Sequence, residues 1–248
     1  MYTKEQILSA LSNVEEPDLK KDLVTLNMIE DVEISGNEVR FSVILTTPAC
    51  PLKAMIENAC NNAIHHFVDK NAVVKINMTS RVTSAAKDPS FPNIKNIVLV
   101  ASGKGGVGKS TVAVNLAISL SKQGAKVGLI DADIYGPSIP MMFKLEGSRP
   151  AAEKNGDKVS LLPIEKYGIK LLSIGFFVDP NQAIPWRGPM VTTALKQLFN
   201  DANWGELDYL IVDTPPGTGD VHITLGQQFP ITGAVIVTTP QNIAVADA

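Results

Sequence analysis

One short loop restricts the possible folds of this chain more than any other feature. It is the glycine-rich segment Gly103-x4-Gly108-Lys109-Ser110, which follows the apolar run 96–102 and precedes a helical pattern. Glycines let the backbone approach a phosphate group closely, and the positive end of the following helix attracts that group. A strand before such a loop and a helix after it form the expected context for phosphate binding. The segment therefore predicts a nucleotide-binding α/β domain.

The residues of this loop have separate expected roles. Lys109 should neutralise the β- and γ-phosphates, Ser110 should ligate Mg²⁺, and Thr111 should touch the α-phosphate. ATP and Mg²⁺ are therefore the expected cofactors. The expected nucleotide contacts are Gly103, Lys104, Gly105, Gly106, Val107, Gly108, Lys109, Ser110 and Thr111.

Lys104 needs its own explanation, because Lys109 already serves the phosphates. A second cation inside the same crowded site would add repulsion. Placed on the rim, Lys104 could instead reach the phosphates of a facing subunit and stabilise the charge that develops during phosphoryl transfer. The alternative is a solvated surface lysine.

Further apolar runs predict a doubly wound, mostly parallel sheet with helices between its strands. The runs are 125–131, 169–176, 207–213 and 232–239, and the expected helices include 109–124 and 189–200. Aspartates occur at the strand ends, where ligands bind in open α/β sheets. Asp213 is expected to hold Mg²⁺ through water, and Asp133 is expected to act on the nucleotide. For Asp131 and Asp220, a loop or capping role is an equal alternative.

The residues before the loop predict a smaller α+β domain with the order α-β-β-α-β. Thr3–Gln6 forms a capping box, two alternating segments flank the turn signal Gly36-Asn37, and Pro51 should open the second helix. The following segment contains two prolines and no apolar period, so it predicts a linker. The expected divisions are 1–82 for the small domain, 83–95 for the linker and 96–248 for the nucleotide-binding domain.

Composition argues against several classes of protein. A net charge of -3 and a pI of about 5.7 do not support bulk nucleic-acid binding. No apolar run approaches the roughly 18 residues of a membrane span, and the first residues lack the pattern of a signal peptide. Two cysteines cannot form a disulfide framework, which favours a reducing cytoplasm.

The two cysteines have different expectations. Cys50 should lie at a helix N-terminus, where the helix dipole favours the thiolate, and the alternative is an inert, half-buried cysteine. Cys60 falls beside the apolar face of its helix and is expected to pack in the core.

Several segments carry a family resemblance. GKGGVGKST resembles the deviant phosphate loop of the MinD/ParA/nitrogenase-iron-protein class. Within that class, DADIYGPSIP, WRGPM, LDYLIVDTPPGTGD and VTTPQNIAVADA look like the Mrp/ApbC branch of iron–sulfur cluster carrier ATPases. This resemblance covers residues 96–248. The first domain, with PDLKKDLVTLNMI and TTPACPLK, is similar to the SufT-like domain of iron–sulfur assembly.

The resemblance implies a function and residue roles. It implies a cytoplasmic homodimer that hydrolyses ATP to ADP and phosphate and delivers iron–sulfur clusters to apo-proteins together with assembly factors. No stable nucleic-acid or membrane binding is expected. Lys104 would be the signature lysine that acts across the dimer. Asp133 would orient the attacking water, and Asp213 would be the Walker B residue.

The cluster ligands are expected elsewhere. The family's cluster-binding Cys-x-x-Cys is expected beyond residue 248, so the chain is expected to be C-terminally truncated and to contain no iron–sulfur ligand itself. Two other functions stay open. One is a ParA/MinD-type positioning ATPase acting on DNA or membrane, which the small N-terminal domain and PPGTGD disfavour. The other is a nucleotide-gated binding module with negligible turnover.

Overall fold

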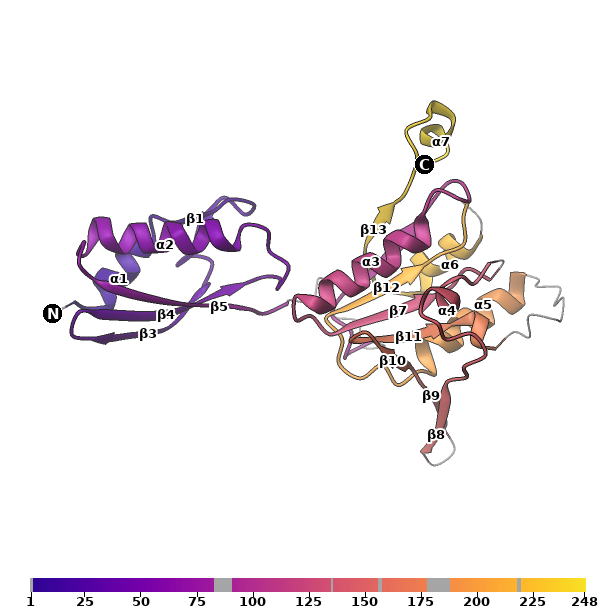
Figure 1. Ribbon diagram of the computed structural model, residues 1–248. Helices are drawn as coiled ribbons and strands as arrows, with labels where there is room; N and C mark the ends of the chain where they lie inside the picture. Colours follow the sequence, from indigo (N-terminus) through magenta and orange to yellow (C-terminus); the bar gives the residue numbers. More distant parts are fainter. Residues whose placement is uncertain (1, 83–90, 135, 156–157, 178–187, 218–219) are drawn as a thin grey trace. The chain divides into compact units, whose positions relative to one another are not determined.

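The computed structural model describes residues 2–82, 91–134, 136–155, 158–177, 188–217 and 220–248. The chain forms two compact units, Met1–Thr83 and Ser84–Ala248, and each has its own hydrophobic core (Figure 1). The first unit is α+β and the second is α/β with a mostly parallel sheet. The fold class expected from the sequence is confirmed.

The first unit has the expected order of helices and strands, with one small addition. Its elements are α1 (Lys4–Leu11), β1 (Glu15–Glu16), β2 (Lys21–Asp22), β3 (Ile29–Ser35), β4 (Glu38–Leu45), α2 (Lys53–Phe67) and β5 (Val73–Ser80). The pair β1–β2 was not expected. The capping box at Thr3 is present, and β3 and β4 pair antiparallel around Gly36, whose φ of 62° suits a tight turn. The helix α2 then carries the chain to β5, which pairs parallel with β4.

The second helix of this unit begins later than expected. Leu52 is the N-cap and Lys53 is the first helical residue, so the prediction that Pro51 opens the helix is wrong. The backbone N–H of Lys53 donates to the carbonyl of Cys50 at 3.4 Å, which makes Cys50–Lys53 a turn before the helix. Cys60 is fully buried in the core, as predicted.

The second unit contains a six-stranded sheet with the order β10-β11-β7-β12-β6-β13. The strands are β6 (Ile97–Ala101), β7 (Val127–Asp131), β10 (Ile164–Lys166), β11 (Ile169–Ser173), β12 (Tyr209–Asp213) and β13 (Ile231–Ile236). Five of them are parallel, and β10 is an antiparallel edge strand. The apolar runs predicted as buried strands all form strands of this sheet, but the prediction of burial is wrong for the run 232–239, because β13 lies at the edge of the sheet and most of its residues are exposed.

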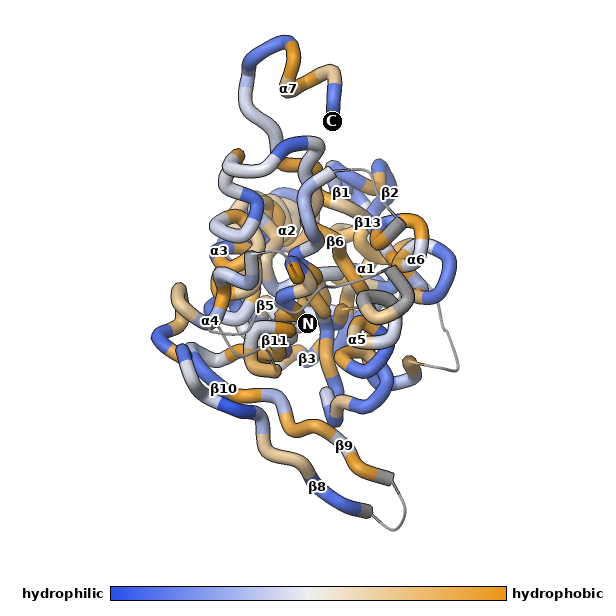
Figure 2. The backbone as a smooth tube through the Cα atoms, turned by 90° about the vertical axis from the view of Figure 1, so that its right-hand side faces the viewer, coloured by the Kyte–Doolittle hydropathy of each residue, from blue (hydrophilic) through white to orange (hydrophobic). Residues whose placement is uncertain are grey.

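Helices cover both faces of this sheet. They are α3 (Lys109–Lys122), α4 (Ile139–Met142), the 3₁₀ turn Ile174–Phe176, α5 (Gly188–Asn200) and α6 (Asp220–Gln228). A last short helix, α7 (Asn242–Ala246), lies apart from the sheet (Figures 1 and 2). Successive side chains of a strand point to opposite faces, and β12 shows the consequence. Leu210 and Val212 pack in the core with α5 and α6, whereas Ile211 packs in the core with α3. The central strands of the sheet are therefore covered on both faces, whereas the edge strand β13 is mostly exposed.

A hairpin that the sequence did not predict stands apart from the sheet. It consists of β8 (Ala151–Asn155) and β9 (Lys158–Leu162), and Figures 1 and 2 both show it projecting from the second unit. The backbone of Leu161 anchors its base, accepting from the N–H of Asn203 and donating to the carbonyl of Asp201.

Part of the expected linker belongs to the second unit. Phe91 and Ile94 are buried in the core that also holds α5 and α6. Residues 91–95 therefore pack with the second unit instead of connecting two domains, and residues 83–90 lie outside the described part of the chain.

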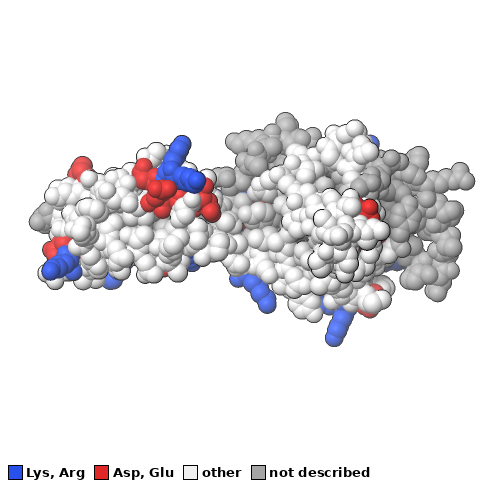
Figure 3. Space-filling model, turned by 90° about the horizontal axis from the view of Figure 1, so that it is seen from above, with Lys and Arg blue, Asp and Glu red and all other residues white. Residues whose placement is uncertain are grey.

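On the face seen in Figure 3, acidic side chains gather at one place on the first unit, beside lysine or arginine side chains, and the other charged side chains of the described residues are scattered. Among the described residues visible there, lysines and arginines stand singly or next to acidic side chains. In the first unit, ion pairs such as Lys75 with Glu38 and Arg81 with Glu30 place opposite charges next to each other. This distribution agrees with the small net charge of the chain.

Candidate functional site

The glycine loop connects β6 to α3 at the carboxyl edge of the sheet. Gly106 and Gly108 have φ values of 80° and 93°, a region that side chains other than glycine rarely adopt. Gly108 is also the N-cap of α3, so the loop runs directly into the helix start. Gly103 is needed for a different reason, because a Cβ there would overlap the carbonyl oxygen of Asp247. The backbone therefore has the conformation expected of a phosphate-binding loop.

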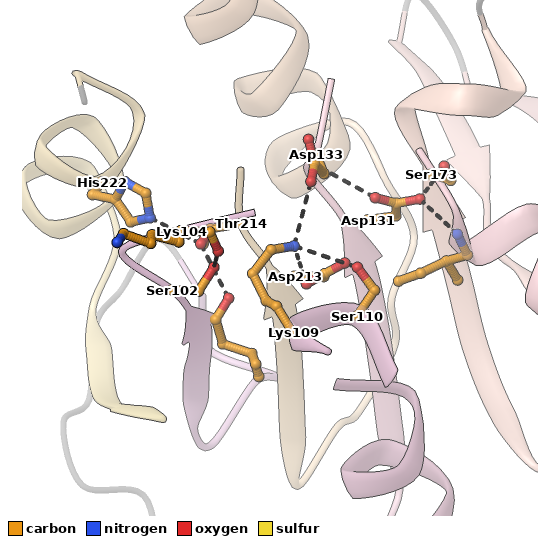
Figure 4. Close-up of polar contacts among 12 residues, drawn as sticks. Ser102, Lys104, Lys109, Ser110, Asp131, Asp133, Ser173, Asp213, Thr214 and His222 are labelled. Carbon is orange, nitrogen blue, oxygen red and sulfur yellow. Dashed lines mark hydrogen bonds and ion pairs between the residues drawn. The ribbon is translucent and has the colours of Figure 1, made fainter. Parts of the chain in front are cut away.

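Lys109 joins the loop to two of the predicted aspartates. Its side chain is buried, and its Nζ lies 2.6 Å from Oδ1 of Asp213 and 3.4 Å from Oδ2 of Asp133 (Figure 4). The hydroxyl oxygen of Ser110 is 3.4 Å from the same nitrogen. Thr111, in the first turn of α3, is exposed. Four residues singled out from the sequence thus meet at one point.

The two aspartates have oxygen atoms without a partner among the described residues. These atoms are Oδ2 of Asp213 and Oδ1 of Asp133, and both are buried. Burial raises the pKa of Asp213, while the hydrogen bond and charge of Lys109 oppose that rise. Buried carboxylate oxygens are normally hydrogen-bonded or bound to a cation, so these atoms mark places for water or a metal ion. Oxygen donors from Asp213 and Ser110 fit Mg²⁺.

Asp131 is placed to shape the loop that carries Asp133. It is fully buried, and its carboxylate accepts hydrogen bonds from the backbone N–H of Asp133 and Ile139, each at 3.2 Å, and from the hydroxyl of Ser173 at 2.9 Å. Burial, with the nearby charge of Asp213, raises the pKa of Asp131 to about 7. Its three donors tie together the ends of two strands and the start of α4.

Lys104 lies apart from the cluster around Lys109. Its Nζ is 3.3 Å from Oδ2 of Asp247, and its backbone carbonyl accepts a hydrogen bond from Ser102 at 2.9 Å. About a third of the Lys104 side chain is exposed, and Figure 4 shows it pointing away from Lys109. The structure thus separates the two lysines of the loop, and the action of Lys104 on a facing subunit stays a prediction.

Sequence reasoning missed two residues next to this site, Thr214 and His222. The hydroxyl of Thr214 donates to the carbonyl of Val100 at 3.0 Å and lies 2.9 Å from Nε2 of His222. Thr214 could have been found because it directly follows Asp213. His222 gave no such signal, because only the fold brings its helix beside β12. The side chain of Asp220 lies outside the described residues.

Both cysteines belong to the first unit and pack with its own core. Cys50 is half-buried against the core of the first unit. Burial raises the pKa of the Cys60 thiol to about 12, which makes it a poor thiolate. In the described part of the chain, no three His, Cys, Asp or Glu side chains are arranged to hold a metal ion, and no helix is long and apolar enough to cross a membrane.

The position of the glycine loop identifies the class of protein. A phosphate loop between a buried strand and a helix, beside a strand that ends in an aspartate, is the arrangement of P-loop NTPases. Comparison with known families then identifies the family. Residues 93–248 match the model of the NUBPL iron-transfer P-loop NTPase in the ParA group, and the chain belongs to this family. Residues 4–78 match a second model, described as iron-sulfur cluster assembly protein.

Individual relatives agree with this assignment. The chain is 48% identical over 250 residues to an iron-sulfur cluster carrier protein of a Synechocystis strain, and the match covers 100% of this chain and 71% of that protein. It is 51% identical over 242 residues to a protein of the same description from Deinococcus radiodurans, covering 98% and 68%. The relatives are thus longer than this chain.

Solved structures also resemble the chain, and among them is one with a known ligand. It is a nucleotide-binding protein of Archaeoglobus fulgidus in complex with ADP. The TM-score is 0.53, the sequence identity is 40%, and the match covers 67% of this chain and 65% of the other. The family resemblance expected from the sequence is therefore confirmed.

Proposed function

We propose that this chain binds ATP with Mg²⁺ and hydrolyses it, and that hydrolysis drives the transfer of iron–sulfur clusters to apo-proteins. The observation that carries the proposal is the cluster around Lys109, in which one buried ammonium is held by two buried carboxylates. The Lys109 ammonium can leave these carboxylates and bind a phosphate if another cation takes its place beside them. Mg²⁺ bound with the nucleotide is that cation.

Different residues are assigned to the phosphates and to the metal ion. The backbone N–H groups of the loop and the start of α3 receive the β-phosphate, and Lys109 moves from Asp213 to the β- and γ-phosphates. Ser110 and Asp213 hold Mg²⁺, the latter through water, as expected for an ion that keeps several waters. When bound, the ion supplies neutralising charge beside the β- and γ-oxygens.

Asp133 is the residue that we assign to the attacking water. Its Oδ1 is buried without a protein partner among the described residues, and its Oδ2 faces Lys109, so the free oxygen can accept a hydrogen bond from that water. A bond forms from the water oxygen to the γ-phosphorus, and the bond to the bridging oxygen breaks. The products are ADP and inorganic phosphate, and the proton leaves with phosphate or solvent. Lys104 of a facing subunit would stabilise the developing charge.

The cargo and the partners belong to the same proposal. The family description speaks of iron transfer, and the relatives from Synechocystis and Deinococcus radiodurans are described as iron-sulfur cluster carriers. We extend that role to this chain as a cytoplasmic homodimer that works with apo-proteins and assembly factors. The cluster is the transported substrate, and its ligands are proposed to lie outside residues 1–248.

The test of the ATPase is phosphate release from ATP with and without Mg²⁺. The parent chain should release phosphate only with Mg²⁺, and Lys109→Ala and Asp213→Asn should lose that activity. Release that is independent of Mg²⁺, or unchanged in both variants, would contradict the proposal. Tight ATP binding without any release would favour a nucleotide-gated binding module.

The test of the cargo is anaerobic reconstitution followed by iron and sulfide analysis. We expect no stable cluster on these 248 residues, because clusters are usually held by about four cysteine thiolates. Each chain has two cysteines and Cys60 is fully buried, so a homodimer offers only its two Cys50 thiols. A stable cluster that Cys50→Ser removes would place the metal site in the first unit and overturn the assignment of the ligands.

A further inference from the structure

The contact between α6 and the residue after Asp213 has no role in the steps above. Thr214 is fully buried, and its hydroxyl lies between the carbonyl of Val100 and Nε2 of His222 (Figure 4). We propose that His222 is a positioning residue for ATP hydrolysis, which holds segment 214–217 against the phosphate loop. This inference rests on the proposed ATPase function, and its test includes a measurement that needs no hydrolysis.

Segment 214–217 is bonded directly to the strand and loop that bind phosphate. The backbone N–H of Thr214 donates to the carbonyl of Val100 at 3.1 Å, and the N–H of Gly217 donates to the carbonyl of Ser102 at 2.8 Å. The hydroxyl of Ser102 in turn donates to the carbonyl of Lys104 at 2.9 Å. A shift of segment 214–217 is therefore passed to the first residues of the loop.

The helix that carries His222, α6, is held in place by the hydrophobic core of the second unit. Leu225 is fully buried and Phe229, just after the helix, is nearly so, and both belong to the core under α5. His222 lies one turn before Leu225, and residues three apart in a helix share a side. His222 therefore reaches Thr214 from a helix that the core holds in place.

The proposal assigns the proton of this contact to His222. The hydroxyl of Thr214 has one proton and donates it to the carbonyl of Val100. In the proposed arrangement Nε2 of His222 therefore carries a proton and donates to the hydroxyl oxygen. A glutamine at position 222 can place an N–H donor near the position of Nε2, whereas leucine has no donor. The inference predicts that His222→Gln retains the contact and that His222→Leu loses it.

The first measurement is amide exchange of Gly217 in the full 248-residue chain, followed by NMR. His222→Leu should speed this exchange roughly fivefold, the factor that corresponds to about 1 kcal/mol of lost hydrogen bonding. His222→Gln should restore the parent rate. The matched control is Gln227→Leu, an exposed position of the same helix, which should leave the rate unchanged.

The second measurement is steady-state ATP hydrolysis with ATP affinity measured separately. His222→Leu should lower kcat about 10- to 100-fold, the range that a displacement of about 1 Å produces, with little change in ATP affinity. His222→Gln should recover most of kcat. A His222→Leu variant with parent exchange and parent kcat overturns the inference, as does a loss that glutamine does not rescue.

The two measurements separate the two hypotheses. If the parent chain hydrolyses no ATP, the proposed function fails, and the exchange rate of Gly217 still decides whether His222 holds the segment. If the parent hydrolyses ATP and the leucine variant matches it in both measurements, the role of His222 alone is refuted.

Discussion

Replacing Lys109 with alanine should weaken the folding of the second unit and the binding of ATP by separate mechanisms. Nζ of Lys109 lies 2.6 Å from Oδ1 of Asp213, whose side chain is fully buried. Removing one partner of a buried ion pair leaves an uncompensated charge and costs about 3–5 kcal/mol. Without Lys109, the already raised pKa of Asp213 rises further. A raised carboxyl pKa makes stability fall as pH increases, so the loss should be smaller in acid.

A second substitution separates the two effects. In Lys109→Ala with Asp213→Asn, the fully buried carboxylate charge at 2.6 Å from the missing ammonium is also removed and only that of Asp133, at 3.4 Å, remains, so much of the stability should return. ATP binding should stay weaker by about 2 kcal/mol, or roughly 30-fold, because the charge-assisted contact with the phosphates is still missing. The difference in unfolding free energy between the single and the double variant therefore measures the cost of leaving the Asp213 carboxylate without its partner Lys109 in the folded protein.

Both quantities are accessible in the same samples. The two tryptophans belong to the second unit, and Trp204 is buried in its core, so urea unfolding followed by tryptophan fluorescence reports on that unit. Calorimetric titration with ATP gives the affinity. The reasoning is refuted if Lys109→Ala unfolds at the parent urea concentration and binds ATP with near-parent affinity. It is also refuted if the double variant is no more stable than the single one.

Three further predictions concern Asp131, Lys104 and the two cysteines. The pKa of Asp131 is raised to about 7, so the protonated carboxyl contributes its full stability below about pH 4. Between about pH 4 and pH 7 the free energy of unfolding should fall by up to about 1.4 kcal/mol per pH unit. Urea unfolding at several pH values should show this slope, and Asp131→Asn should remove it. Lys104→Ala should keep ATP binding but lose hydrolysis and ATP-dependent dimerisation, and mixing it with Asp133→Ala tests action across the dimer; unchanged turnover would exclude that role. Cys50 should alkylate faster than Cys60 near neutral pH, because the buried thiol has its pKa raised to about 12, and equal labelling measured by mass spectrometry would contradict this.

Features that depend on near neighbours could be predicted from the sequence. The capping box at Thr3, the turn at Gly36 and the glycine loop before α3 each use residues within a few positions of one another. The strands β6, β7, β11 and β12 were predicted because they are buried on both faces and read as continuous apolar runs, whereas β13 is an apolar run that is mostly exposed at the edge of the sheet. The start of α2 was misplaced at Pro51, because a turn that holds Cys50 and Lys53 precedes the helix.

Contacts between distant residues were decided only by the tertiary structure. Lys109 and Asp213 are 104 residues apart, and they meet because β12 lies between β6 and β7. In that order Asp213 is level with Val100 on one side and with Asp131 on the other. An apolar run specifies that a strand is buried, but any parallel neighbour satisfies its backbone hydrogen bonds equally well. The order of the strands follows instead from packing of the whole unit, and so does the approach of His222 to the site.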